Sequence, residues 1–190
     1  VGRFADIKGT AELFDAMLQV HHLAPHVRWV IAGGVPENPK SERRWLKRWN
    51  HLAPDSLKER VRMLGWCAPD KVGGLYASAA VVVAPSWYET FGMGVLEAMS
   101  FACPIAASAA GGVPEFIEHG KTGLLSEPGD VPGLVEHILH LLGDPSFAKS
   151  LGRAASVRRR RPARRPRARP LAGKGRWCAP GRRPTRYGWP

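Results

Sequence analysis

The chain contains 190 residues, carries a formal net charge of +12 and has three cysteines. This length suits one domain with or without a tail, and no run approaches the roughly 20 apolar residues that a membrane span requires. Cys67, Cys103 and Cys178 are too few and too scattered for a disulfide framework or a zinc site. Because the first residues also lack a signal-peptide pattern, we expect a cytoplasmic protein.

In chain order, predicted strands alternate with helices. Residues 1–3 look like the end of a strand whose earlier residues are absent, and the apolar spacing after residue 10 predicts an amphipathic helix. Four further strands are predicted over 28–34, 61–66, 79–84 and 103–108, and a last short one ends at residue 125. Helical segments follow them. This order predicts an α/β fold with a doubly wound, mostly parallel sheet.

The most informative stretch follows the apolar run 79–84, which reads as a buried parallel strand. Gly92 and Gly94 lie near the start of the next helix, where unpaired N–H groups and the helix dipole favour a phosphate. Glu97 lies about 6 Å into that helix, at 1.5 Å per residue, and Glu89 lies in the loop before it. Two sugar-binding acids with phosphates between them would suit a nucleotide sugar.

The residues around these acids form the pattern Pro-Ser-x-x-Glu-x-Phe-Gly-x-x-x-Leu-Glu-Ala-Met. This pattern resembles retaining GT-B glycosyltransferases, and within them glycosyltransferase family 4. The resemblance implies that Glu89 lies by the donor sugar, that the backbone of Phe91, Gly92 and Met93 lies by the distal phosphate, and that Glu97 lies by the ribose. The alternative is that Glu97 is a solvated helix residue and Glu89 a loop charge.

Two further segments share features with that family. Gly2-Arg3 and Lys8 match a Gly-Arg…Lys-Gly pattern, which implies that Gly2 contacts the donor and that Arg3 and Lys8 neutralise its diphosphate; a pair of surface cations is the alternative. Gly111 and Gly112 belong to a Gly-Gly-Val-Pro-Glu segment, which implies close approach to the sugar. A simple turn from strand to helix would also explain these two glycines.

The resemblance covers residues 1–151 and implies one half of a GT-B enzyme, the Rossmann-like domain that binds a nucleotide-diphosphate sugar. It implies that the catalytic residues are Arg3, Lys8 and Glu89, that no metal is required, and that the acceptor-binding half is absent. We therefore expect weak donor binding and little transfer by this chain alone. The sugar, the base and the acceptor are not specified. A sugar-nucleotide epimerase with the same fold is an alternative.

Two other segments have more than one interpretation. The basic helix within 36–52 could contact a membrane surface or nucleic acid, but we favour an outer helix that packs Trp45 and Trp49 inward. Contact with a membrane would make the protein peripheral at the inner membrane face. By the resemblance, Trp66 or Cys67 lines the base pocket, whereas packing of Trp66 in the core is at least as good an explanation.

The carboxyl end differs from the rest of the chain. Residues 153–190 contain thirteen Arg, one Lys and no acid, a charge of +14, whereas residues 1–152 contain 14 basic and 16 acidic residues. We therefore predict a domain over 1–152 and a disordered Arg/Pro-rich tail over 153–190. The tail could bind nucleic acid through phosphates, in a non-enzymatic protein. We favour instead a frame-shifted or truncated end without a role.

Overall fold

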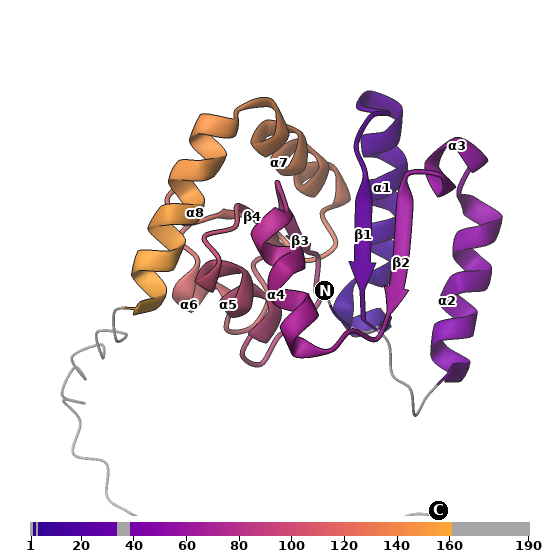
Figure 1. Cartoon of the computed structure of the whole chain (residues 1–190), viewed down its shortest axis with the longest axis horizontal. Helices are drawn as coiled ribbons and strands as arrows, with labels where there is room; N and C mark the ends of the chain where they lie inside the picture. The colour runs from indigo at the N-terminus through magenta and orange to yellow at the C-terminus, as the bar shows by residue number, and fades with distance from the viewer. Residues whose placement is uncertain (1, 3, 34–38, 161–190) are drawn as a thin grey trace, which may run out of the picture.

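The computed structural model describes residues 2, 4–33 and 39–160, with the backbone alone for 39–42 and 160. Its strands form two parallel sheets (Figure 1). In the first sheet, β1 (Trp29–Ala32) pairs with β2 (Val61–Gly65). In the second, β4 (Ile105–Ser108) lies between β3 (Val82–Ala84) and β5 (Leu124–Ser126). The predicted α/β class and parallel pairing are confirmed.

Helices connect and cover these strands. They are η1 (Asp6–Lys8), α1 (Thr10–Leu23), α2 (Pro39–Leu52), α3 (Asp55–Lys58), α4 (Pro69–Ser78), α5 (Met93–Ser100), α6 (Val113–Phe116), α7 (Val131–Gly143) and α8 (Pro145–Arg160). Pro69 begins α4 because a proline at the first helical position forfeits no intrahelical hydrogen bond. Asp130 caps α7 by accepting a hydrogen bond from the Gly133 N–H group. Contacts between α1 and α7 join the two sheets.

The buried side chains form three clusters, one on each side of the larger sheet and one beside the smaller. The first cluster gathers α1, α7, α8 and β4, and includes Val20, Ile138 and Leu141. The second packs α5 and α8 against the other face of β4. The third packs Phe14 and Met17 of α1 against α2 and β1. The larger sheet is therefore packed against helices on both faces, and the smaller sheet is packed against α1 and α2.

The predicted burial of the strand at 79–84 is only partly correct. β3 is half-buried along its length, whereas β4 is buried throughout. The physical reason is that β3 pairs with β4 on one side only, and its other edge faces an apolar groove instead of β1. The described strands therefore make two sheets rather than the single sheet that the strand–helix order predicts.

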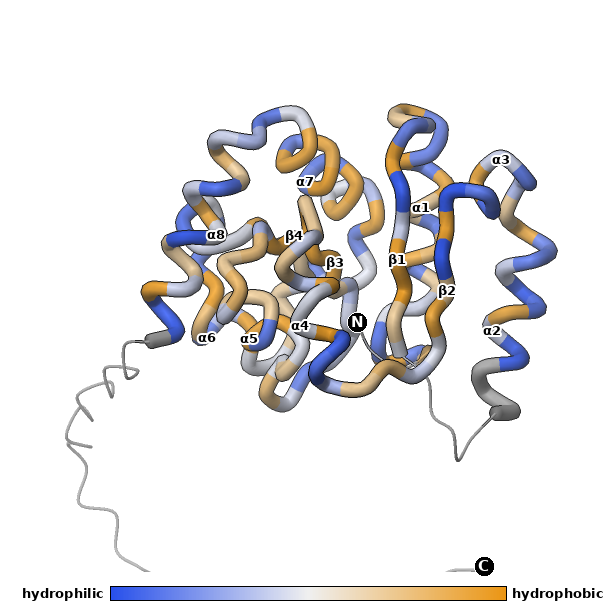
Figure 2. The backbone as a smooth tube through the Cα atoms, viewed as in Figure 1, coloured by the Kyte–Doolittle hydropathy of each residue, from blue (hydrophilic) through white to orange (hydrophobic). Residues whose placement is uncertain are grey.

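The expectation for the basic helix is confirmed. Trp45 and Trp49 of α2 are 3% and 4% exposed and pack on Phe14, while Arg44 and Arg48 lie over the ring of Trp45 at the surface. Figure 2 shows hydrophilic and hydrophobic segments along this helix. Core packing of Trp66, however, is wrong, because that side chain is 61% exposed after the end of β2. No helix of the described residues is long and apolar enough to cross a membrane.

The boundary predicted after residue 152 is also wrong, because it lies inside α8, which ends at Arg160. Ala155 is buried against the cluster around α5. Arg158 donates hydrogen bonds to the Glu118 carboxylate (3.1 Å) and to the Glu115 carbonyl (3.2 Å). Residues 153–160 therefore belong to the folded domain, and residues 161–190 of the predicted tail lie outside the described residues.

Candidate donor-binding cleft

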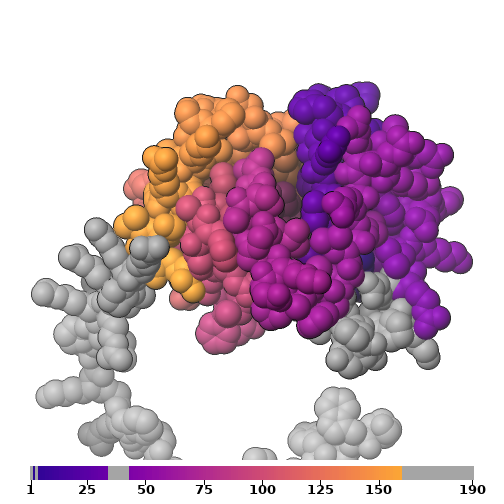
Figure 3. Space-filling model, in the orientation of Figure 1, coloured from indigo at the N-terminus to yellow at the C-terminus, as the bar shows by residue number. Residues whose placement is uncertain are grey.

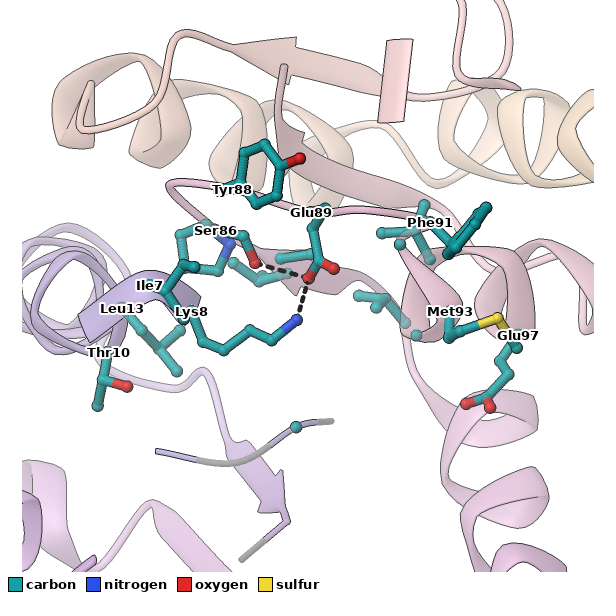
Figure 4. Close-up of a pocket in the computed structure, with 18 of the residues that line it drawn as sticks. Ile7, Lys8, Thr10, Leu13, Ser86, Tyr88, Glu89, Phe91, Met93 and Glu97 are labelled. Carbon is teal, nitrogen blue, oxygen red and sulfur yellow. Dashed lines mark hydrogen bonds and ion pairs between the residues drawn. The ribbon is translucent and has the colours of Figure 1, made fainter. Parts of the chain in front are cut away.

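A cleft of about 530 Å³ opens where β1 and β3 end. Its walls are η1, the loop after β3 and the first two turns of α5 (Figure 4). Seven of the ten residues predicted to form the site line this cleft: Gly2, Lys8, Glu89, Phe91, Gly92, Met93 and Glu97. Residues far apart in the sequence therefore meet at the carboxyl ends of parallel strands, which is where open α/β sheets bind ligands.

The carboxylate of Glu89 is the centre of the polar contacts in this cleft. Its Oε1 accepts a hydrogen bond from the Lys8 ammonium at 2.6 Å and a second from the Ser86 hydroxyl at 3.0 Å (Figure 4). The Glu89 and Lys8 side chains are 15% and 31% exposed, so the ion pair is largely shielded from water and still reachable from the cleft. Such charge-assisted bonds fix both side chains more firmly than an exposed pair would.

Lys8 reaches Glu89 because η1 is fixed to the loop after β3. The backbone N–H of Trp87 donates to the Ile7 carbonyl at 3.0 Å. Gly9 ends η1 in the left-handed region (φ 65°), and a Cβ there would lie 1.8 Å from the Pro85 carbonyl oxygen. Only glycine allows this approach, so the Lys8-Gly9 pair brings the ammonium to the loop that carries Glu89.

The Glu89 loop is also held from its other side, by the segment after β4. The backbone N–H of Gly112 donates to the Glu89 carbonyl at 2.9 Å. A Cβ on Gly111, whose φ is 53°, would lie 1.9 Å from that same oxygen. Gly111 and Gly112 do not line the cleft, so the close approach that they allow in this structure is to the backbone of Glu89.

The start of α5 forms the opposite wall. Gly92 is the N-cap of α5 and lies in the left-handed region (φ 60°), so the predicted helix start near this glycine is confirmed. Since glycine has no side chain, no side-chain group caps the helix. The Gly92 carbonyl accepts the N–H groups of Val95 and Leu96, and the N–H groups before them have no intrahelical partner by geometry. Phe91 and Met93 are 71% and 62% exposed at the cleft. An anion at this helix start would meet N–H donors and the positive end of the dipole.

Glu97 extends from α5 into the cleft and is held by a residue that sequence reasoning missed. The Tyr76 hydroxyl donates to Glu97 Oε2 at 3.1 Å, and the Tyr76 ring is buried and stacked on Phe101. Burial, together with the neighbouring Glu97 carboxylate, raises the pKa of Tyr76, so the hydroxyl keeps its proton and stays a donor. The Cys103 thiol in turn donates to the Tyr76 carbonyl at 2.7 Å.

Three of the predicted site residues do not line the cleft in the described structure, and three residues that were not predicted support it. Arg3 lies outside the described residues, and Gly111 and Gly112 lie behind the Glu89 loop. Ser86, Gly9 and Tyr76 were not predicted. Ser86 stands three residues before Glu89, a spacing that could have indicated the contact, whereas nothing in the sequence places Tyr76 beside Glu97. Among the described residues, no three His, Cys, Asp or Glu side chains lie close enough together to hold a metal ion.

Comparison with known protein families identifies the domain. A family described as "Glycosyl transferases group 1" matches residues 1–144. The chain belongs to this family. The resemblance to GT-B glycosyltransferases drawn from the glutamate pattern is therefore confirmed, as is the Rossmann-like half of a GT-B fold.

Individual relatives of this glycosyl transferase domain agree with the family match. Alpha-maltose-1-phosphate synthase of Mycolicibacterium smegmatis is 33% identical over 165 residues, covering 83% of this chain and 41% of that protein. Alpha-D-kanosaminyltransferase of Streptomyces kanamyceticus is 28% identical over 156 residues, covering 82% of this chain and 39% of that protein. The chain thus spans about two-fifths of these relatives' length.

Solved structures show the same fold. The sucrose-phosphate synthase of Thermosynechococcus elongatus superposes with a TM-score of 0.72 at 32% identity, over 84% of this chain and 39% of that one. The Anabaena protein Alr3699/HepE, solved in complex with UDP and glucose, superposes with a TM-score of 0.72 at 28% identity, over 83% and 42%. The glycosyl transferase domain therefore has the architecture of one part of larger proteins.

Proposed function

We propose that this glycosyl transferases group 1 domain binds the nucleotide-diphosphate sugar of a retaining glycosyltransferase. The observation that carries the proposal is one cleft in which Lys8, Glu89, Glu97 and the glycine-capped start of α5 converge. A cation, two acceptors and a row of N–H donors are the groups that a diphosphate flanked by two sugar rings requires. The Anabaena relative, solved with UDP and glucose, supports this assignment.

Each group has a distinct role in the proposed complex. The diphosphate lies at the N–H groups that begin α5, the ribose hydroxyls donate to Glu97, and the sugar hydroxyls donate to Glu89. Gly2 contributes its backbone to the same cleft. Lys8, together with Arg3, stabilises the negative charge that develops as the bond between the anomeric carbon and the diphosphate breaks.

The ion pair between Lys8 and Glu89 orders both side chains before the donor binds. In the structure the Lys8 ammonium is 2.6 Å from Glu89 Oε1. A bound diphosphate offers Lys8 a second anion, and Glu89 offers the sugar an acceptor that is already oriented by Ser86. The pair therefore holds both side chains in place before the donor arrives, which lowers the cost of ordering them on binding.

Other parts of the proposal concern what accompanies the donor. We propose that the acceptor binds between this domain and a second, N-terminal half, that the location is cytoplasmic, and that no metal is required because Lys8 and the helix start supply the positive charge. The family match favours glycosyl transfer over an epimerase or over nucleic-acid binding through the Arg-rich end.

Calorimetric titration of the full chain with UDP, GDP, ADP and their glucose conjugates tests donor binding. We expect saturable binding to one base, weakened by Glu97→Ala and by Lys8→Ala. The matched controls are Glu136→Ala and Lys149→Ala, which remove exposed charges outside the cleft. Binding that none of the cleft variants changes would contradict the proposal.

Two additional measurements test the remaining parts. Lys8→Ala should weaken the nucleoside diphosphate more than the free nucleoside, and equal losses would contradict the phosphate role. Titration in EDTA should give the same affinity as titration with Mg²⁺, and a requirement for Mg²⁺ would contradict the metal-independent part. We also expect little or no sugar transfer by this chain alone; robust transfer would show that no second half is needed.

A further inference from the structure

The two oxygens of the Glu89 carboxylate are held unequally. Oε1 accepts hydrogen bonds from the Lys8 ammonium at 2.6 Å and from the Ser86 hydroxyl at 3.0 Å, as the dashed lines in Figure 4 show. No donor in the described part of the chain reaches the second oxygen, Oε2. Since a carboxylate oxygen accepts about two hydrogen bonds, Oε1 is fully used, and Oε2 is the atom that remains for a ligand in the cleft.

The two donors on Oε1 come from different parts of the molecule. Ser86 lies in the same loop as Glu89, three residues before it, and is 4% exposed. Lys8 comes from η1, 81 residues earlier. In the space-filling view, a hollow separates the indigo residues, to which Lys8 belongs, from the magenta and orange ones (Figure 3). The hydroxyl is therefore a fixed part of the loop, whereas the ammonium reaches Glu89 on a long flexible stem from another segment.

A bound diphosphate competes for only one of these two donors. Under the proposed function, on which this inference rests, the diphosphate lies at the start of α5 and attracts Lys8. The Lys8 side chain is 31% exposed and lines the cleft, so its ammonium can turn toward that second anion. The buried Ser86 hydroxyl keeps its bond to Oε1. Without Ser86, the departure of Lys8 would leave Oε1 with no donor in the described part of the chain.

We propose that Ser86 is a positioning residue for Glu89: it holds Oε1 while Lys8 transfers to the diphosphate, and it keeps Oε2 directed at the hydroxyls of the donor sugar. The Glu89 backbone is fixed independently, because the Gly112 N–H donates to its carbonyl at 2.9 Å. Ser86 therefore controls the orientation of the side chain rather than the position of the loop. Its effect falls on the sugar half of the donor, whereas that of Lys8 falls on the diphosphate half.

Calorimetric titration of the full chain separates the two halves. UDP, GDP and ADP are each titrated alone and as the glucose conjugate, and the ratio of conjugate affinity to diphosphate affinity is taken for the base that binds. Ser86→Ala should lower this ratio about 10-fold, because Glu89 loses a charge-assisted hydrogen bond. Lys8→Ala should weaken both ligands without lowering the ratio. The matched control is Ser100→Ala, which removes an exposed hydroxyl on α5 that donates to the Leu96 carbonyl.

Ser86→Thr keeps the hydroxyl and should restore the ratio. A ratio that Ser86→Ala leaves unchanged would overturn the positioning role, even if that variant unfolds at a lower temperature. A ratio that Lys8→Ala lowers equally would overturn the transfer of Lys8, because the ammonium would then remain on Glu89 in the complex. Diphosphate binding without conjugate binding by the wild-type chain would overturn this inference alone. If the wild-type chain binds none of these ligands, the donor site itself is contradicted, and this inference fails with it.

Discussion

The contact between Gly111 and the Glu89 backbone gives the sharpest prediction, the substitution Gly111→Ala. The new Cβ would lie 1.9 Å from the Glu89 carbonyl oxygen and 2.8 Å from its carbon, and both are backbone atoms that cannot rotate away. The left-handed φ of 53° adds about 1–2 kcal/mol for a residue other than glycine. Displacement of the loop also costs the hydrogen bond from Gly112, about 1 kcal/mol.

Together these losses amount to about 2–3 kcal/mol, which lowers the unfolding midpoint by roughly 5–10 °C in a domain of this size. The displaced loop also carries Glu89 away from Lys8, so donor affinity should fall with stability. Thermal unfolding and calorimetric titration of the full chain measure the two effects separately.

Gly120→Ala is the matched control for this substitution. Gly120 also has a left-handed φ, of 74°, but a Cβ there meets nothing within 4 Å. It therefore shares the conformational cost and lacks the clash. Equal loss of stability in the two variants, with donor binding intact in both, would refute the inference that a glycine is needed at 111 for the close contact with the Glu89 backbone.

Two further predictions concern the chain of contacts behind Glu97. Tyr76→Phe removes the donor that orients Glu97, so the preference for a nucleoside diphosphate over its 2′,3′-dideoxy analogue should fall about 3–10-fold; an unchanged preference would contradict the positioning role. Burial raises the pKa of the Cys103 thiol from 9.0 to about 11, so the stability that this group contributes is complete below pH 9 and is lost as the pH rises toward 11. The wild-type midpoint should therefore fall more steeply over that range than that of Cys103→Ala, and parallel curves would contradict this.

The sequence predicted most of the elements and most of the site because both depend on local signals. The apolar run before residue 85, the glycine at the start of α5 and the proline that begins α4 are each read within a few residues. The glutamate pattern identified the family for the same reason. Since parallel strands end at one edge, local signals at several strand ends were enough to bring Lys8, Glu89 and Glu97 to one cleft.

What the sequence could not predict depends on contacts between distant segments. The Lys8–Glu89 pair joins residues 81 positions apart, and its geometry follows from the approach of Gly9 to Pro85. The exposure of Trp66 depends on which segments pack beside the end of β2, and the spacing of apolar residues does not predict those neighbours. The apolar run at 79–84 predicted a buried strand, whereas β3 is only half-buried. An edge strand and a central strand share that apolar pattern, so the sequence could not predict the groove beside β3.

The carboxyl end of the domain provides a final prediction. A chain cut after Arg160 should unfold at the same temperature as the full chain, whereas a chain cut after Gly152 should unfold about 2–8 °C lower, for a packing loss of about 1–2 kcal/mol. The chain that ends at Gly152 loses Ala155 from the core beside α5 and also loses the two hydrogen bonds of Arg158.

The pair between Arg158 and Glu118 can be separated from that packing. The Lys121 ammonium holds the pKa of the Glu118 carboxyl below its usual range, and Arg158 lowers it further. The stability that the charged Glu118 contributes is therefore present at neutral pH and is lost as the pH falls through that lowered pKa. Arg158→Ala should therefore reproduce only a small part of the loss, because the pair lies at the surface and is screened. If the two truncated chains unfolded together, α8 beyond Gly152 would contribute nothing to the fold, and the abrupt change in composition would mark the domain's end after all.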